Sequence, residues 1–424
     1  MRIAILIYGL DGIGGIAKHT LYLSRELVAL GHDLTLYAVE YNQQQCYPDI
    51  TRNLDIRSFR SVETPFAVSM PHYPGLRMLN YIQSIGHYYH DQRILSAALA
   101  EGYDVVNPHG NTISWAAATY KQRYGTPVVW LCNDFLPIGS HRYEQVSGTL
   151  ATMKHQLKSA LFEPICRYDE TSVRSIDTIA VLSSRVQQQM QEHYQVSSQI
   201  VRPGVDSVQF ARGDAAKIRQ RHGIDAQTFL IMTVSMPMPR RRIEDVIRAT
   251  RLLRDQGHPV QYMVVGRTSH SADYMALLEQ EIAACDLADH VTFTGEVAEH
   301  ELPDYYHACQ AFVWASDENQ SWGMAGMEAM AAGKPTLVSQ ANGLAEVLED
   351  GMTALLIPPR SPEAIATAIH RIITEPAWAT ALAQRGQQFV QQHYSWRRHA
   401  EEMVNLFEEA VGRPHRTEQT QEGA

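Results

Sequence analysis

The chain has 424 residues, of which 45% are apolar and 19% are charged, a composition typical of globular proteins with a large hydrophobic core. At roughly 100–200 residues per domain, this length predicts two or three domains. No apolar run approaches the roughly 18 residues that a membrane-spanning helix needs, which argues against an integral membrane protein. A secretory signal needs a basic start, a longer apolar stretch and a small-residue cleavage site; the N-terminal segment instead leads directly into glycines, and we expect it to form a first β-strand.

The distribution of charge argues against nucleic acid as a partner. The formal net charge is −10. The first 205 residues contain 17 basic and 17 acidic side chains, so residues 206–424 carry the whole net charge. Binding to nucleic acid needs a basic face, and neither half has a basic surplus. Association with a membrane surface is compatible with the neutral N-terminal half but is not indicated by it.

The cysteines are far apart in the sequence and form no C-x-x-C pair. They are Cys46, Cys132, Cys166, Cys285 and Cys309. This spacing favours neither a disulfide framework nor a structural zinc site. We therefore expect unlinked thiols and a location in a reducing cytoplasm.

The N-terminal half alternates strand and helix patterns. A buried strand over Arg2–Gly9 leads into the glycine turn Gly12–Gly15 and then into a helix that ends at Leu30. Further strands are predicted at Asp33–Val39, Val105–Asn107, Pro127–Cys132 and Thr178–Leu182. A helical stretch over Tyr73–Ala100 either covers an acceptor site or packs as an ordinary amphipathic helix.

The C-terminal half repeats this alternation after the turn signal Pro203-Gly204. Strands are predicted at Phe229–Val234, Gln261–Val265, Val291–Thr294, Ala311–Trp314 and Thr336–Ser339, with a helix over Ile243–Gln256. We therefore predict an α/β protein with two facing, doubly wound, Rossmann-like domains over residues 1–205 and 206–392. A C-terminal helix at 393–411 packs back, and a disordered tail follows at 412–424. Ligands of such sheets bind in the cleft at the carboxyl ends of the strands.

The segment Ser316–Pro335 has the strongest functional signal. A strand ends near Trp314, and a helix begins near Gly323. The amides of Gly323, Met324 and Ala325 then have no partners within the helix and are suited to a diphosphate. Glu328 lies one turn further, where its carboxylate either reaches a polyol such as ribose or pairs locally.

Two features of the N-terminal half are weaker candidates. The turn at Gly14 and Gly15 lies between a strand and a helix, where it either contacts a phosphate or sugar or serves only as a turn. His109 and Asp134 follow predicted strands and could orient an acceptor, although a structural role for His109 is the alternative.

Gln320–Pro335 resembles the E-x7-E segment of retaining glycosyltransferases of family 4, usually written E-G-F-G-L-x-x-x-E-A-M-A-x-G-x-P. Other family elements have counterparts along nearly the whole chain. They are Gly14-Gly15, Gly31-His32, Pro203–Asp206 with Phe210, Phe293–Val297, Tyr305-Tyr306 with Ala308, Gly343–Glu346, Glu349–Gly351 and Leu355–Pro359.

The resemblance implies the GT-B fold and transfer of a hexose, with retention of configuration, from a nucleotide-diphosphate sugar. The donor would be a UDP- or GDP-sugar, and neither a metal nor a further cofactor is implied. Glu328 would bind the ribose, and Gly323, Met324 and Ala325 would contact the sugar and diphosphate. The backbone at Val297 would contact the base, and Gly14-Gly15 would approach the diphosphate. The acceptor, whether glycan, lipid or small molecule, cannot be inferred.

Three positions depart from the family pattern. Gln320 replaces the first glutamate, which contacts donor-sugar hydroxyls in the family. In the phosphate clamp G-R-L-x-x-x-K, Met236 replaces the arginine and Arg241 replaces the lysine; Arg240 or Arg242 could compensate for the lost charge. Asn133 precedes Asp134 where His-Asp is common, and asparagine cannot carry a proton.

These observations lead to one main hypothesis and two alternatives. The main hypothesis is an active retaining hexosyltransferase that uses front-face transfer, with a catalytic set of His109, Asn133, Asp134, Arg241 and Gln320. The first alternative is a catalytically impaired homologue that binds a sugar nucleotide or acts as a partner subunit. The second is a GT-B sugar-nucleotide epimerase, which would release a free epimerised sugar.

Overall fold

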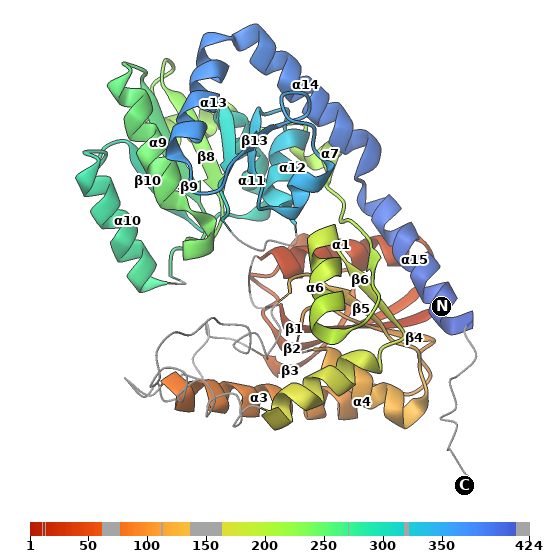
Figure 1. Ribbon diagram of the computed structural model, residues 1–424. Coiled ribbons are helices and arrows are strands. Elements are labelled where there is room, and N and C mark those ends of the chain that lie inside the picture. The colour runs from red at the N-terminus through yellow and green to blue at the C-terminus, as the bar shows by residue number, and fades with distance from the viewer. Residues whose placement is uncertain are drawn as a thin grey trace. The chain divides into compact units, whose positions relative to one another are not determined.

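The computed structural model describes residues 1–10, 12, 14–61, 77–111, 113–135, 163–269, 271–317 and 322–412. Two compact units make up the chain, and Figure 1 shows their elements. The first unit comprises Met1–Val181, Gln187–Val201 and the residues from Ala400, and the second comprises Leu182–Val186 and Arg202–His399. Two predictions, Gln320 and the tail beyond Gly412, lie outside the described residues.

The strands of the first unit are all parallel. They are β1 (Arg2–Leu10), β2 (Asp33–Tyr41), β3 (Asp55–Ser61), β4 (Val105–Pro108), β5 (Val129–Cys132), β6 (Thr178–Val181) and β7 (Gln199–Ile200). They form sheets of order β3-β2-β1-β4 and β5-β6-β7. Single bridges from Val106 to Val128 and from His109 to Leu131 connect β4 with the β5 segment. The combined order 3-2-1-4-5-6, with β7 added, is that of a doubly wound Rossmann-like sheet.

Helices cover this sheet and bury its apolar side chains. They are α1 (Gly15–Ala29), α2 (Pro48–Thr51), α3 (Arg77–Ala98), α4 (Ser114–Tyr124), a helix over 163–174 and α6 (Ser184–Tyr194). Leu95 and Leu99, at and just beyond the end of α3, share one core with Ala116 and Tyr120 of α4. The C-terminal part of the helix predicted over Tyr73–Ala100 therefore packs on the sheet.

The second unit repeats this topology. Its strands are β8 (Phe229–Val234), β9 (Val260–Val265), β10 (Val291–Gly295), β11 (Ala311–Trp314), β12 (Thr336–Ser339) and β13 (Leu355–Ile357). They are parallel, in the order β10-β9-β8-β11-β12-β13. Renumbered within the unit, this order is again 3-2-1-4-5-6.

Some helices of the second unit begin at residues whose side chains cap them, whereas others, such as the helix over Met324–Ala331, have no side-chain cap. The elements are α7 (Ser207–Phe210), α8 (Ala215–Arg221), η2 (Pro239–Arg241), α9 (Ile243–Asp255), α10 (Ala272–Ala284), η3 (Glu299–Glu301), α11 (Leu302–Ala308), α12 (Met324–Ala331), η4 (Gly343–Val347), α13 (Pro362–Thr374) and α14 (Pro376–His393). The last helix, α15 (Trp396–Gly412), begins in the second unit and belongs to the first from Ala400 onward. Asp206, Asp214, Ser271 and Ser361 each accept a hydrogen bond from a first-turn amide of the helix that follows. Gly412 belongs to α15, so its placement in the tail was wrong.

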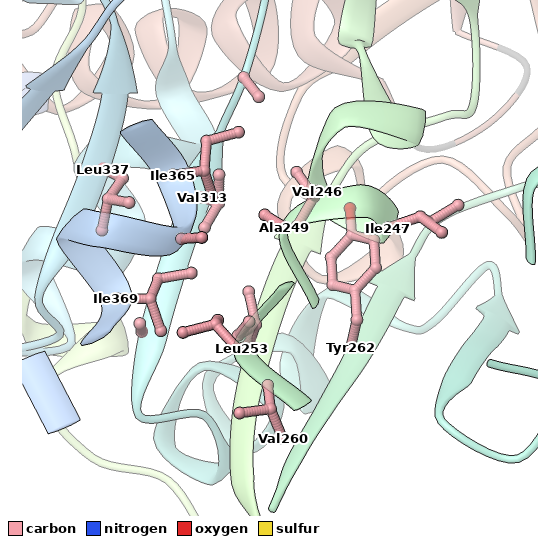
Figure 2. Close-up of a cluster of buried hydrophobic side chains, with 14 of the residues drawn as sticks. Val246, Ile247, Ala249, Leu253, Val260, Tyr262, Val313, Leu337, Ile365 and Ile369 are labelled. Carbon is pink, nitrogen blue, oxygen red and sulfur yellow. The ribbon is translucent and has the colours of Figure 1, made fainter. Parts of the chain in front are cut away.

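Successive side chains of β11 point to opposite faces of this sheet, and different helices cover the two faces. Val313 points into the cluster of Figure 2, together with Val246 and Leu253 of α9 and Ile369 of α13. Phe312 packs on the other face, with its ring centroid 5.6 Å from that of Tyr306 in α11. Each fully buried aliphatic or aromatic side chain of this kind contributes about 1.5–3 kcal/mol. The sheet is therefore a rigid support for its carboxyl edge.

Each sheet has one point where the strand order reverses. In the first unit it lies between β1 and β4, and in the second between β8 and β11. Consecutive helices leave this point on opposite faces, so the loops at the carboxyl ends separate and leave room for a ligand. Most of the residues singled out from the sequence follow the ends of these strands.

Candidate active site

The loop after β11 leads into α12 at the reversal point of the second sheet. Gly323 is the N-cap residue, and no side chain caps the helix. Its carbonyl accepts hydrogen bonds from the amides of Gly326 (3.0 Å) and Met327 (3.2 Å). The amides of Met324 and Ala325 precede the first helical hydrogen bond, and both residues are half-buried. This end of α12 therefore presents donors and a positive dipole end suited to an anion.

Glu328 is held in place by a tyrosine of a neighbouring helix. Its side chain is buried, and its Oε2 accepts a hydrogen bond of 2.8 Å from the hydroxyl of Tyr306 in α11. The same hydroxyl lies 3.1 Å from the carbonyl oxygen of Ala325. Burial, together with the Glu328 charge and this hydrogen bond, raises the pKa of Tyr306 well above its usual value. The phenol therefore remains a proton donor and orients the carboxylate.

The loop after β8 brings three consecutive arginines to the same edge of the sheet, in different roles. The guanidinium carbon of Arg241 lies 4.6 Å from the ring centroid of Trp314, at the end of β11. Arg240 donates from Nε to Sδ of Met238 at 3.1 Å. Arg242 binds Asp245 through two hydrogen bonds of 2.8 and 2.9 Å and forms an ion pair of 2.7 Å with Glu244.

These contacts show which arginines of the loop are suited to replace the clamp arginine and which is not. The hydrogen bond to Asp245 is the main cause that raises the pKa of Arg242, and the adjacent carboxylates already balance its charge. Arg242 is therefore poorly suited to bind a diphosphate. Arg241 lies over the ring of Trp314 at the end of β11, and Arg240 precedes it in η2, so these two arginines remain the candidate phosphate-binding cations of this loop.

Arg267, which sequence reasoning missed, lies beside the residue that replaces the clamp arginine. Its Nη2 is 3.7 Å from Sδ of Met236, the residue that replaces the clamp arginine. It follows Gly266, whose φ of +149° and whose approach to the carbonyl of Ser235 leave no room for a side chain. The only signal in the sequence was its position directly after strand β9, because loops at that edge of a parallel sheet converge.

The remaining donor-binding candidates are less defined. Val297 is half-buried and follows the end of β10, at the same edge of the sheet. The structure does not describe Gln320. A shallow pocket lies beside α10 and shares no residue with the predicted donor-binding set. It is lined by Thr268, Ser269, Ala272, Met275, Ala276 and Glu279.

The glycine turn of the first unit leaves open space. Gly14 is the N-cap residue of α1 with an extended backbone (φ −166°), and a methyl group built on it would meet nothing within 4 Å. Gly15, the first residue of α1, is exposed. Neither backbone strain nor packing requires glycine at position 14. Close approach of a ligand is the remaining physical reason for a glycine there.

Asn133 contacts a histidine that the sequence did not single out. Its Nδ2 lies 2.8 Å from Nδ1 of His19 in α1, and both side chains are buried. The family pattern has a histidine at position 133, and in this chain His19 places an imidazole next to that position. Asp134 is half-buried, and its carbonyl oxygen accepts a hydrogen bond from Sγ of Cys132.

His109 is part of a buried network. Its Nδ1 lies 2.7 Å from the hydroxyl of Thr20, and its Nε2 lies 2.8 Å from Oδ1 of Asn107. Asn107 in turn donates to the carbonyl of Val129 in β5. Because both ring nitrogens have partners and the side chain is 1% exposed, this geometry favours the structural role over acceptor orientation.

Three findings concern metal binding, disulfide bonds and membrane-spanning helices. Among the described residues, no group of three or more histidine, cysteine, aspartate or glutamate side chains is arranged to hold a metal ion. The five cysteines form no disulfide. In the part of the chain that the structure describes, no helix combines the length and apolar character needed to cross a membrane.

The geometry and the comparisons agree on the class of protein. Residues 13–209 match the model of Glycosyltransferase Family 4, and residues 214–389 match that of Glycosyl transferases group 1. Together the two models match most of the chain, which therefore belongs to the family 4 (group 1) glycosyltransferases, with the GT-B fold.

Its relatives are similar along much of their length. D-inositol 3-phosphate glycosyltransferase of Nocardiopsis dassonvillei is 25% identical over 72% of this chain and 70% of its own length. The enzyme of the same name from Saccharomonospora viridis is 27% identical over 73% of this chain and 70% of its own length. Among solved structures, Anabaena HepE in complex with UDP and glucose superposes with a TM-score of 0.73, covering 96% of this chain and 100% of that chain at 17% identity.

Proposed function

We propose that this glycosyltransferase is an active, retaining, metal-independent hexosyltransferase. It moves a hexose from a nucleotide-diphosphate sugar to an acceptor by front-face transfer. The observation that carries the proposal is Glu328, buried one turn from the open end of α12 and oriented by Tyr306. A fixed carboxylate beside free helix amides suits ribose hydroxyls next to a diphosphate.

In this proposal the second unit holds the donor. The first-turn amides of α12 at Gly323, Met324 and Ala325 bind the sugar and diphosphate, and the backbone at Val297 contacts the base. HepE was solved with UDP and glucose, and this supports a UDP-sugar as the first donor to test. A relative from Mycobacterium tuberculosis is described as GDP-mannose-dependent, and this supports testing GDP-sugars as well.

Transfer then depends on stabilising the departing diphosphate. Arg241, which lies over the ring of Trp314, and Arg240 supply positive charge from the loop after β8. Arg267 replaces the missing clamp arginine from the neighbouring loop, because its guanidinium contacts Met236. In front-face transfer the donor phosphate takes the acceptor proton, so the chain needs no histidine at position 133.

The residues of the first unit complete the proposal. The open turn at Gly14 and Gly15 approaches the diphosphate, while Asn133 and Asp134 lie on the acceptor side, with His19 supporting Asn133. Gln320 binds donor-sugar hydroxyls. The acceptor is a glycan, a lipid or a small molecule, and the chain acts in the cytoplasm.

A thermal-shift screen tests the donor site directly. UDP-, GDP-, ADP- and dTDP-sugars are added with and without EDTA, and the unfolding temperature is measured. Ligand at a hundredfold excess over Kd stabilises the native state by about 2.7 kcal/mol. We expect one nucleotide to raise the unfolding temperature equally with and without EDTA. A shift with none of them would favour the impaired partner subunit, and a shift abolished by EDTA would contradict metal independence.

A further inference from the structure

Among the described residues, the buried side-chain amide of Asn342, at the carboxyl edge of the second sheet, is hydrogen-bonded through its oxygen but not through its nitrogen. Asn342 follows β12, and 2% of its surface is exposed. Its Oδ1 accepts a hydrogen bond of 2.8 Å from the amide of Leu344, which caps η4. Its Nδ2 is buried and has no hydrogen-bond partner among the described residues.

The orientation of this amide is determined by its cap. A backbone N–H at Leu344 needs an oxygen acceptor, so a flipped amide would place two donors against each other. Nδ2 is therefore a fixed donor rather than a rotating group. A buried donor without a partner costs about 1–3 kcal/mol, so this position is unfavourable unless a ligand supplies an acceptor.

The unpaired donor lies at the open end of α12. A methyl group built on Gly323, the N-cap residue, would lie 3.0 Å from Oδ1 and 3.4 Å from Nδ2 of Asn342. The φ of Gly323 is −122°, a value that any residue adopts. Glycine is therefore required at position 323 because Asn342 occupies the space that a side chain would need. The amide of Asn342 adds a side-chain donor to the backbone donors at this end of α12.

Two other buried polar groups at the end of β11 share this feature. Ser316 is 1% exposed and Trp314 is 6% exposed. The hydroxyl of Ser316 and Nε1 of Trp314 have no hydrogen-bond partner among the described residues. The adjacent parallel strands β11 and β12 thus both end in donors that the described chain does not use.

We propose that Asn342 is a further donor-binding residue whose Nδ2 donates a hydrogen bond to an oxygen of the glycosyl diphosphate at the N-terminus of α12. This inference rests on the proposed function and assigns a residue of the same site. Two groups of one ligand offer such an oxygen, the diphosphate and the hexosyl ring. A neutral, preorganised donor suits either of them and needs no rearrangement on binding.

Two substitutions separate donor binding from the cap. N342D keeps the oxygen that caps Leu344 but replaces the amide donor with a negative charge. N342S also keeps an acceptor oxygen and stays neutral. We expect N342S to unfold at or above the temperature of the wild type, because it removes a buried donor without a partner, and N342D to unfold at a lower temperature, because it buries a carboxylate. Affinity for the nucleotide sugar should fall about 3- to 10-fold in N342S and on the order of 10- to 100-fold in N342D.

The matched control is Asn42, which caps a turn after β2. Its Oδ1 accepts hydrogen bonds from the amides of Gln44 (3.1 Å) and Gln45 (3.2 Å). N42D makes the same chemical change in the first unit, at a turn after β2 rather than at the end of α12. We expect it to leave the Kd of every nucleotide unchanged.

Calorimetric titration with UDP, UDP-glucose, GDP and GDP-mannose identifies the oxygen. An equal loss with the nucleoside diphosphate alone assigns the hydrogen bond to the phosphate, and a loss confined to the nucleotide sugar assigns it to a hexosyl hydroxyl. If folded N342S and N342D bind all four ligands as the wild type does, the inference is wrong. If the wild type binds none of them, the proposed function itself fails, and E328A serves as the reference for loss of the site.

Discussion

The two sheets have the same strand order and very different chemistry at their carboxyl edges. At the reversal point of the first sheet, His109, Thr20 and Asn107 bond to one another, and His19 lies against Asn133. Those polar groups are mostly used within the protein. At the reversal point of the second sheet, no side chain caps α12, and Nδ2 of Asn342 and the hydroxyl of Ser316 have no hydrogen-bond partner among the described residues. The loop after β8 adds the positive charges of Arg240 and Arg241.

This difference shows that the order 3-2-1-4-5-6 determines where a ligand can bind, whereas the loops determine which ligand binds. The carboxyl edge of the first sheet is neutral, and its polar groups bond within the protein, so it keeps a fixed shape. Such an edge suits acceptors of different chemistry. A cationic edge with an uncapped helix suits an anion. The predictions below test this division between the two units, from the largest expected effect to the smallest.

Removing Arg241, the cation that we propose for the leaving group, should have the largest effect. R241A leaves the ring of Trp314 without its guanidinium and, in the proposed site, removes a positive charge beside the departing diphosphate. We expect kcat to fall on the order of 100- to 1000-fold with little change in acceptor affinity. The measurement is initial transfer rate against donor and acceptor concentration.

The control for this variant is R248A. Arg248 forms an exposed ion pair with Glu281 through two hydrogen bonds of 2.7 Å in the same unit, so its loss should leave kcat unchanged. Wild-type turnover in R241A would show that the cationic edge does not act on the leaving group.

Removing the carboxylate of the second unit should weaken the donor rather than slow the chemistry. E328A loses the predicted hydrogen bonds to ribose, and we expect Kd for the nucleotide to rise about 100-fold. Y306F removes only the hydroxyl that orients Glu328 and should raise Kd about 5-fold. Calorimetric titration measures both.

Tyr305, the neighbour of Tyr306 in α11, provides the matched substitution. Its hydroxyl contacts Arg221 and His222, outside the predicted site. Y305F should bind the nucleotide as the wild type does, and equal effects of Y305F and Y306F would mean that α11 acts only through stability.

The stability of the fold should vary with pH because of His399, which lies outside the carboxyl edges of both sheets. His399 is buried, and burial lowers its pKa to about 3, while the unfolded chain titrates near 6.5. Between these values the unfolded state binds more protons, so stability falls as the pH drops below about 6.5. We expect a loss of about 2 kcal/mol between pH 7 and pH 5 from this group.

Denaturant unfolding at both pH values measures this loss. H399N keeps a side-chain donor for the carbonyl of Arg202, which lies 3.1 Å from the ring, but cannot titrate. It should reduce the pH dependence by about the same 2 kcal/mol, whereas H300N, at an exposed position, should not. An unchanged slope in H399N would assign the pH dependence to other groups.

The replacement cation should contribute less than Arg241 because it is exposed. Arg267 is 43% exposed and lies 3.9 Å from Glu296, so water and this carboxylate weaken its charge. R267A should raise the donor KM about 10-fold, and M236R should restore most of the loss in the double variant. Failure of M236R to restore binding would indicate a remodelled phosphate site.

The smallest expected effect belongs to the first unit. G14A places a methyl group in open space, so the unfolding temperature should not change. If the diphosphate approaches this turn, kcat/KM should fall about 5-fold because the methyl group keeps the two apart. The control G86A lies in α3 at another open position and should leave kcat/KM unchanged. Wild-type kinetics in G14A would leave only the second unit as the donor site.

Much of the fold was predictable because it depends on local periodicity. β8, β11 and β12 match their predicted bounds, and β1 and β9 differ from theirs by one residue. Buried parallel strands form continuous apolar runs, which are visible without a structure. The strands β3, β7 and β13 were missed because β3 has a mixed pattern of polar and apolar residues and the other two are very short.

The sequence by itself determined the strand–helix alternation, the open glycine end of α12 and the carboxylate at Glu328, because each of these depends on neighbours within a few residues. Only the tertiary structure decided which residues share the site. Tyr306 reaches Glu328 across 22 positions, Arg267 reaches Met236 across 31 and His19 reaches Asn133 across 114. Those pairs form because parallel strands bring distant loops to one edge, and no local pattern in the sequence encodes which side chains meet there.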